Sequence, residues 1–163
     1  SLVMPLVIRW PGVVEPGSIN DDIVSNLDFA ETFLDIAGAG IPREMQGRSF
    51  LPILKGRTPA DWRKTFYYHY YEFPGAHSVA RHYGVTDGHY KLINFYENKD
   101  WEMFDLTADP NELQSIYGRK EYVGIQSRLE KELVRLRQYY RVPNKDPDST
   151  RPKPRPKRTN KKK

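Results

Sequence analysis

Residues 66–84, FYYHYYEFPGAHSVARHYG, hold three of the four histidines of this sequence, together with an arginine and seven aromatic residues. Such a set suits a metal site, a cluster that binds a polar ligand, a platform for stacked bases, or a strand with a polar edge. Imidazole and guanidinium groups donate hydrogen bonds to hydroxyls, carboxylates and sulfates. The other parts of the sequence are needed to separate these possibilities.

A metal site is the first possibility, because His77 and His82 have an H-x4-H spacing that zinc sites sometimes use. In one strand, however, residues five apart point to opposite faces, and no third ligand accompanies this pair. The sequence has no cysteine. Its absence excludes a disulfide framework, a thiolate zinc site and a cysteine nucleophile. The pattern therefore predicts no metal ligand here.

The net charge of +5 invites a nucleic-acid partner, but the positive charge lies at one end of the chain. Nine of the 26 Lys and Arg and two of the 21 Asp and Glu fall in residues 144–163, so residues 1–143 carry a slight negative charge. Stacked bases need aromatics beside a basic groove, which the body of the chain does not offer. We predict no specific nucleic acid and a disordered tail over 144–163, whose weak contact with anionic polymers stays open.

The first third of the sequence predicts one strand and one helix. Residues 3–10 are apolar at nearly every position, as in a strand covered on both faces, and no later segment resembles its neighbour. Residues 23–37 repeat apolar residues at steps of three and four, which predicts a helix with Ser25 as N-cap and Gly38 after its end. No run is long and apolar enough for a membrane span, and no signal peptide is visible.

The remainder predicts a short helix with Ser49 before it and Gly56 after it, four strands, and a helix over residues 121–140 with an apolar stripe. Asp87-Gly88 predicts a two-residue type I′ hairpin between the second and third strands. The four strands are expected at residues 67–72, 79–86, 90–96 and 101–105.

These elements carry motifs in a familiar order. IRWPG at 8–12, VSNLDFAETFLDIAG at 24–38 and GRSFLPILKG at 47–56 resemble the closing part of the catalytic domain of type I sulfatases, in the alkaline-phosphatase-like superfamily. Farther on, HYKLINFY at 89–96 and WEMFDLTADPNEL at 101–113 resemble segments of the family's small C-terminal subdomain. The resemblance covers residues 1–143 and leaves out the tail.

The resemblance implies an α/β, alkaline-phosphatase-like fragment of three parts. Residues 1–65 would be the final strand and helices of an incomplete catalytic domain. Residues 66–143 would be an α+β C-terminal subdomain with a four-stranded antiparallel sheet and a packed terminal helix, and residues 144–163 the basic tail. Without the missing N-terminal catalytic half, the apolar strand and helix stripe of the first part are expected to be exposed and to promote aggregation.

The resemblance also implies hydrolysis of sulfate esters on sulfated glycans by the full-length enzyme, with N-acetylglucosamine-6-sulfate as the narrower expectation. Sulfatases of this type use a formylglycine, made within a Cys/Ser-x-Pro-x-Arg motif, and a divalent ion that is usually calcium. This sequence lacks that motif, so the chain itself is predicted to be inactive, with no catalytic residue and no metal ligand. The parent is expected to be secreted or periplasmic, with no membrane partner.

In this family the loop after the first strand of the subdomain leans over the active-site mouth. His77, Arg81 and His82 are therefore the predicted contacts to a sulfated sugar substrate. His69 and His89 are expected to be structural, and Asp28 and Asp35 to be solvated or capping residues.

Two other functions stay open. One is a phosphodiesterase or phosphonate hydrolase of the same superfamily, and the other is a non-catalytic glycan- or polyanion-binding module that uses the sheet and the basic tail.

Overall fold

The computed structural model describes residues 4–73 and 78–146. The predicted contact His77 and the predicted tail from residue 147 onward lie outside the described residues. The chain divides into two compact units, Ser1–Phe66 and Tyr67–Lys163, and each unit is described by itself.

The first unit contains α1 (Asp28–Ile36) and α2 (Leu51–Leu54). Its small core is made by Phe50, Ile53 and Trp62, and the Trp62 indole Nε1 donates a hydrogen bond of 3.0 Å to the carbonyl of Ile23. Four partly buried side chains pack against this core: Ile8, Val24, Phe29 of α1 and Leu54 of α2. The predicted short helix is thus present as a single turn.

Helix α1 is shorter than predicted and turns its polar side inward. Asp28, Glu31 and Thr32 are buried, whereas Leu27 and Phe33 of the predicted stripe are 48% and 65% exposed. The glycine predicted to end the helix, Gly38, has φ +67°, as a residue just after a helix end often has. The apolar stripe is therefore a surface of this unit. Asp28 is buried and not solvated, but it has the capping role that was the other expectation, since its carboxylate accepts a hydrogen bond of 2.7 Å from Ser25 N.

Residues 4–10 do not form the predicted strand: they have no regular secondary structure and pair with no other described segment. Met4 and Val7 are 74% and 89% exposed. A strand depends on hydrogen bonds to a neighbour, so an apolar run without one stays irregular.

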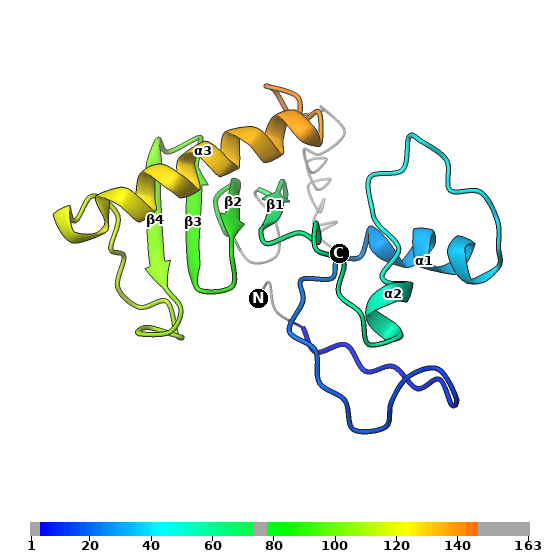
Figure 1. The fold of residues 1–163 in the computed structure, drawn as a ribbon. Helices are drawn as coiled ribbons and strands as arrows, with labels where there is room; N and C mark the ends of the chain where they lie inside the picture. Colours follow the sequence, from blue (N-terminus) through cyan, green and yellow to red (C-terminus); the bar gives the residue numbers. More distant parts are fainter. Residues whose placement is uncertain (1–3, 74–77, 147–163) are drawn as a thin grey trace, which may run out of the picture. The chain divides into compact units, whose positions relative to one another are not determined.

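The second unit is a four-stranded sheet covered on one face by a helix (Figure 1). The strand order follows the chain, and β2–β3 and β3–β4 are antiparallel pairs, so the predicted meander is confirmed. Tyr83 and Trp101 both lie opposite Asn94 in the register. The strands are β1 (Phe66–Tyr70), β2 (His82–Thr86), β3 (Tyr90–Phe95) and β4 (Asp100–Asp105).

The hairpin between β2 and β3 turns one residue later than predicted. Thr86 pairs with Lys91, and Asp87 N donates a hydrogen bond of 3.2 Å to the carbonyl of Tyr90, so Gly88 and His89 occupy the turn. Gly88 has φ +88°, the conformation of the first turn residue in a type II′ hairpin. The Asp87 carboxylate accepts hydrogen bonds from the backbone N–H groups of His89 and Tyr90, at 3.0 and 2.7 Å, which fixes this register.

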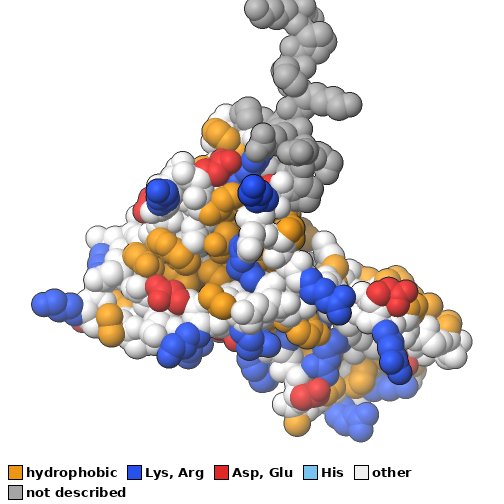
Figure 2. Space-filling view, turned by 90° about the horizontal axis from the view of Figure 1, so that it is seen from above, with side chains coloured by type: hydrophobic (Ala, Val, Ile, Leu, Met, Phe, Trp, Pro, Cys, Tyr) orange, Lys and Arg blue, Asp and Glu red, His pale blue; other side chains and the backbone are white. Residues whose placement is uncertain are grey.

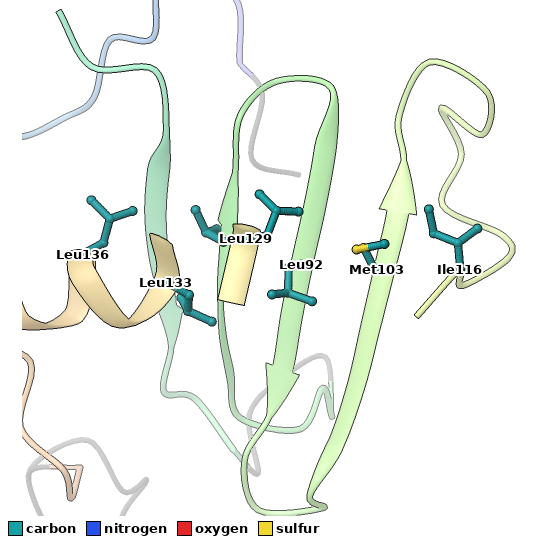
Figure 3. Close-up of a cluster of buried hydrophobic side chains, with 7 residues drawn as sticks. Leu92, Met103, Ile116, Leu129, Leu133 and Leu136 are labelled. Carbon is teal, nitrogen blue, oxygen red and sulfur yellow. The ribbon is translucent and has the colours of Figure 1, made fainter. Parts of the chain in front are cut away.

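Helix α3 (Val123–Tyr139) packs the predicted stripe onto the sheet (Figure 3). A 3-10 turn, η1 (Lys120–Tyr122), leads into it. The core consists of aliphatic and methionine side chains from the helix, three strands and the segment after β4: Val85, Leu92, Met103, Ile116, Leu129, Leu133 and Leu136. Seven buried apolar side chains of this size provide the main stabilisation of the unit.

Candidate substrate-contact site

The predicted site residue His82 lies at the start of β2 within a group of aromatic rings. Its ring stacks on Tyr70 at a centroid distance of 5.3 Å and meets Tyr68 edge-on at 5.6 Å, and Phe95 lies 5.0 Å away. Its Nδ1 lies 2.8 Å from the carbonyl oxygen of Ala80. A carbonyl can only accept, so Nδ1 carries the hydrogen of this contact, and Nε2 has no hydrogen-bond partner among the described residues.

Two phenol groups beside His82 have unused hydrogen-bonding capacity. The hydroxyl oxygens of Tyr68 and Tyr70 are buried and have no hydrogen-bond partner among the described residues. Burial raises the pKa of Tyr68 well above its usual value, so this phenol stays protonated and keeps a donor. Buried polar groups are nearly always paired, so unpaired ones indicate a contact that the described residues do not supply.

Gly84 provides the space that the Tyr68 ring occupies. A Cβ on Gly84 would lie 2.7 Å from Cε1 of Tyr68 and 2.4 Å from the carbonyl oxygen of Leu92. Alternation along β1 places Tyr68 and Tyr70 on one face and Tyr67 and His69 on the other. The sequence analysis did not single out Tyr68 and Tyr70, although alternation along the strand could have grouped them with His82.

Arg81 is buried, and every contact it makes among the described residues is internal. Its Nε donates a hydrogen bond of 2.7 Å to the carbonyl of Tyr71, and Nη2 donates one of 2.9 Å to the carbonyl of Phe73. Nη1 lies 3.3 Å from a carboxylate oxygen of Glu97 and 3.7 Å from one of Asp146. Arg81 therefore fixes the backbone that leads out of β1.

His69 lies on the α3 face, in a network of phenols. Its Nδ1 is 3.1 Å from the hydroxyl of Tyr67, and its Nε2 is 3.4 Å from the hydroxyl of Tyr96 and 3.7 Å from Asp146 Oδ1. Burial lowers the pKa of His69 to about 4, against the attraction of Asp146. His69 is thus a neutral structural residue at ordinary pH.

His89 lies at the hairpin, away from this network. Its side chain is half exposed, and its Nε2 is 3.1 Å from a carboxylate oxygen of Asp105.

The described residues offer no metal site, since no group of three or more His, Asp or Glu comes together among them. In the same part of the chain, the helices are too short or too polar to cross a membrane.

Comparison with known proteins identifies the family. A profile described as N-sulphoglucosamine sulphohydrolase, C-terminal, matches residues 1–139. The chain belongs to this sulfatase family. The resemblance to the closing part of a sulfatase is confirmed, and so is the alkaline-phosphatase-like fold class with its four-stranded sheet and C-terminal helix.

Individual sulfatase relatives are similar over most of the chain. An N-acetylglucosamine-6-O-sulfatase of Bacteroides thetaiotaomicron is 49% identical over 148 residues, which cover 89% of this chain and 26% of that protein. A protein solved in complex with its substrate, D-glucosamine-2-N,6-O-disulfate, is 45% identical with a TM-score of 0.81, over 85% of this chain and 28% of the other. The chain thus spans about a quarter of the length of these relatives.

A relative of another activity has the same fold. The phosphonate monoester hydrolase from Silicibacter pomeroyi is 25% identical with a TM-score of 0.67, over 80% of this chain and 28% of that enzyme.

Proposed function

We propose that this chain is the C-terminal part of a sulfatase that hydrolyses sulfate esters on sulfated glycans, with a 6-sulfated glucosamine unit as substrate. The observation that supports it is 49% identity, over nearly all of the chain, to an N-acetylglucosamine-6-O-sulfatase. Identity at this level is far above what the shared fold requires, since the phosphonate hydrolase keeps the fold at 25%.

In this proposal the His82 face of the sheet forms one wall of the substrate pocket. His82 Nε2 makes a hydrogen bond with a sugar hydroxyl, and the phenols of Tyr68 and Tyr70, which have no partner among the described residues, supply two donors beside it. Arg81 positions the backbone next to the site, and His77 is proposed as a further contact.

The first unit has a packing role in the proposal. Its exposed apolar side chains, among them Leu27, Phe33 and Ile36, lie on or next to α1 and would be covered by the remainder of the enzyme. This remainder would also hold the formylglycine, which supplies the nucleophile, and calcium, which stabilises charge on the sulfate oxygens. The chain contributes neither group, so alone it should not hydrolyse sulfate esters.

The likeness to a phosphonate monoester hydrolase supports a second candidate, the hydrolysis of phosphonate or phosphate esters. A chimaera tests both. In the Bacteroides N-acetylglucosamine-6-O-sulfatase, residues of this chain replace the region that matches them, and the product is assayed with N-acetylglucosamine-6-sulfate and with a phenyl phosphonate monoester.

The sulfatase proposal predicts that the chimaera releases sulfate and that its kcat/KM for the sulfated sugar exceeds that for the phosphonate. A chimaera that folds, as judged by a cooperative melt, yet prefers the phosphonate would favour the second candidate. One that folds and hydrolyses neither compound would contradict both.

A further inference from the structure

A concave surface lies on the opposite face of the sheet from His82. It is a hollow of about 660 Å³ beside the C-terminal half of α3, named here the α3 hollow. Its lining includes Tyr83 from β2, Trp101 from β4, and Leu133, Arg137, Arg141 and Asn144. Because Tyr83 follows His82 directly in β2, the two side chains point to opposite faces, and the hollow is separate from the proposed substrate wall.

Within residues 4–73 and 78–146, the two arginines of the hollow have no carboxylate partner. Among the described residues, neither Arg137 of α3 nor Arg141, just after its end, forms an ion pair, whereas Arg128 and Arg135 of α3 pair with Asp87 and Glu132. On the α3 side of the molecule, Lys and Arg side chains stand beside exposed apolar groups (Figure 2). Unpaired guanidinium groups beside an apolar lining favour an anionic ligand.

The aromatic residues of the hollow are held rigidly. The Arg137 guanidinium lies 4.0 Å above the ring of Tyr83, and the Tyr83 hydroxyl accepts a hydrogen bond of 3.2 Å from Asn94 Nδ2. The Trp101 indole stacks on Tyr117 with an angle of 8° between the rings. A fixed indole beside polar side chains suits a ring-shaped ligand with one apolar face and a hydroxylated edge.

The lining also contains groups that recognise hydroxyls. Gln138 and Asn144 border the hollow and carry amide donors and acceptors, and Glu130 accepts hydrogen bonds from Tyr117 and Gln126 through one oxygen. A sugar that carries an anionic group could contact every part of this lining. Its anion would bind the arginines, its hydroxyls would bond to the amides, and its ring face would stack on the indole.

We propose that the α3 hollow, on the opposite face of the sheet from His82, binds a sulfated sugar unit of a glycan chain. The choice of a sulfated ligand rests on the proposed function, while the site rests on the hollow and its two unpaired arginines. Such a site would hold a polymeric substrate on the enzyme between catalytic events, because a second contact raises the local concentration of the chain.

The test titrates the full chain with a heparin-derived hexasaccharide and follows tryptophan fluorescence. The variant Arg137→Gln/Arg141→Gln should bind about tenfold more weakly. Arg141→Gln alone, which leaves the Arg137–Tyr83 contact intact, should also weaken binding. The matched control is Arg135→Gln, which removes one positive charge from α3 outside the hollow. It should change the affinity less than about twofold. Trp101→Phe should remove the fluorescence change.

Several outcomes would overturn the proposal. One is equal weakening by Arg135→Gln, and another is loss of binding only when the Lys and Arg of residues 147–163 are changed to Gln. Equal affinity for inorganic sulfate would show that no sugar is recognised, and equal affinity for an oligonucleotide of the same charge would show a general polyanion site. His82→Ala should leave this binding unchanged, so failure here and failure of the proposed function are separate results.

Discussion

Arg63 holds the carboxylate of Asp28 with both of its terminal nitrogens. Nη2 lies 2.6 Å from Oδ1, and Nη1 contacts Oδ2. Asp28 is fully buried, and its two oxygens also accept hydrogen bonds of 2.8 Å from Arg48 N and 2.7 Å from Ser25 N. One carboxylate thus joins the start of α1, the segment before α2 and the segment after it.

Replacing Asp28 should therefore lower the stability of the first unit strongly. Asp28→Asn removes the charge while Arg63 stays mostly buried, and we expect a loss of about 3–5 kcal/mol in the free energy of unfolding. Urea unfolding followed by the fluorescence of Trp62 measures it. Asp35→Asn is the matched control: it lies on the same helix, is exposed and bonds to Ser49, so it should cost less than about 1 kcal/mol. Equal losses in both variants would contradict this role of Asp28.

Gly47 should not tolerate a side chain. A Cβ at this position would lie 2.1 Å from the carbonyl oxygen of Leu27 and 2.6 Å from Oε1 of Glu31, which accepts a hydrogen bond of 2.7 Å from Gly47 N. Because backbone atoms cannot move aside cheaply, Gly47→Ala should cost at least about 2 kcal/mol. Gly40→Ala, in the same unit and with nothing within 4 Å, should be nearly neutral in the same thermal melt. Similar melting temperatures for the two variants would refute the close approach.

His69 should make the second unit less stable in weak acid. Its pKa is about 4 in the folded chain and about 6.5 when unfolded, so between these values the unfolded chain takes up a proton that the folded chain excludes. The free energy of unfolding should fall by up to about 3 kcal/mol as the pH drops from about 6.5 to about 4. Urea titrations across this range measure the fall.

His69→Gln should flatten this part of the stability curve, and His89→Gln, at the half-exposed histidine, should leave it as it is. A wild-type chain with constant stability from pH about 6.5 to about 4 would show that His69 accepts its proton in the folded state.

The side chain of Arg81 should stabilise the backbone after β1 more than the exposed Arg128 side chain stabilises its own surroundings. Arg81→Ala leaves the carbonyls of Tyr71 and Phe73 without their donor, and we expect faster proteolysis near these residues and a loss of about 2–3 kcal/mol. Arg128→Ala, which breaks the exposed pair with Asp87, should cost less than about 1 kcal/mol. If the protease cleaves both variants at the wild-type rate, Arg81 does not fix this backbone.

The second unit was predicted well because the sequence patterns that specify it, turn residues and regular apolar spacing, are local. The stripe of α3 reached the core at Leu129, Leu133 and Leu136, and the meander followed from alternation and turn residues. The hairpin register was missed by one residue, since it depends on the hydrogen bonds of the Asp87 side chain.

The first unit was predicted less well because its contacts are distant in sequence. The buried face of α1 depends on Arg63, 35 residues from Asp28, and no periodicity shows that an arginine will neutralise a carboxylate there. The first strand lacks a neighbour among the described residues. In the candidate site, the sequence supplied His82, but the unpaired hydroxyls of Tyr68 and Tyr70 became visible only in the structure.

The most direct test of the proposed substrate wall is the KM of the sulfatase chimaera for N-acetylglucosamine-6-sulfate, with and without His82. If His82 Nε2 contacts the sugar, His82→Ala should raise KM about tenfold with kcat little changed, whereas His89→Ala should leave both constants unchanged. An unaltered KM in a His82→Ala chimaera that melts like its parent would contradict the account.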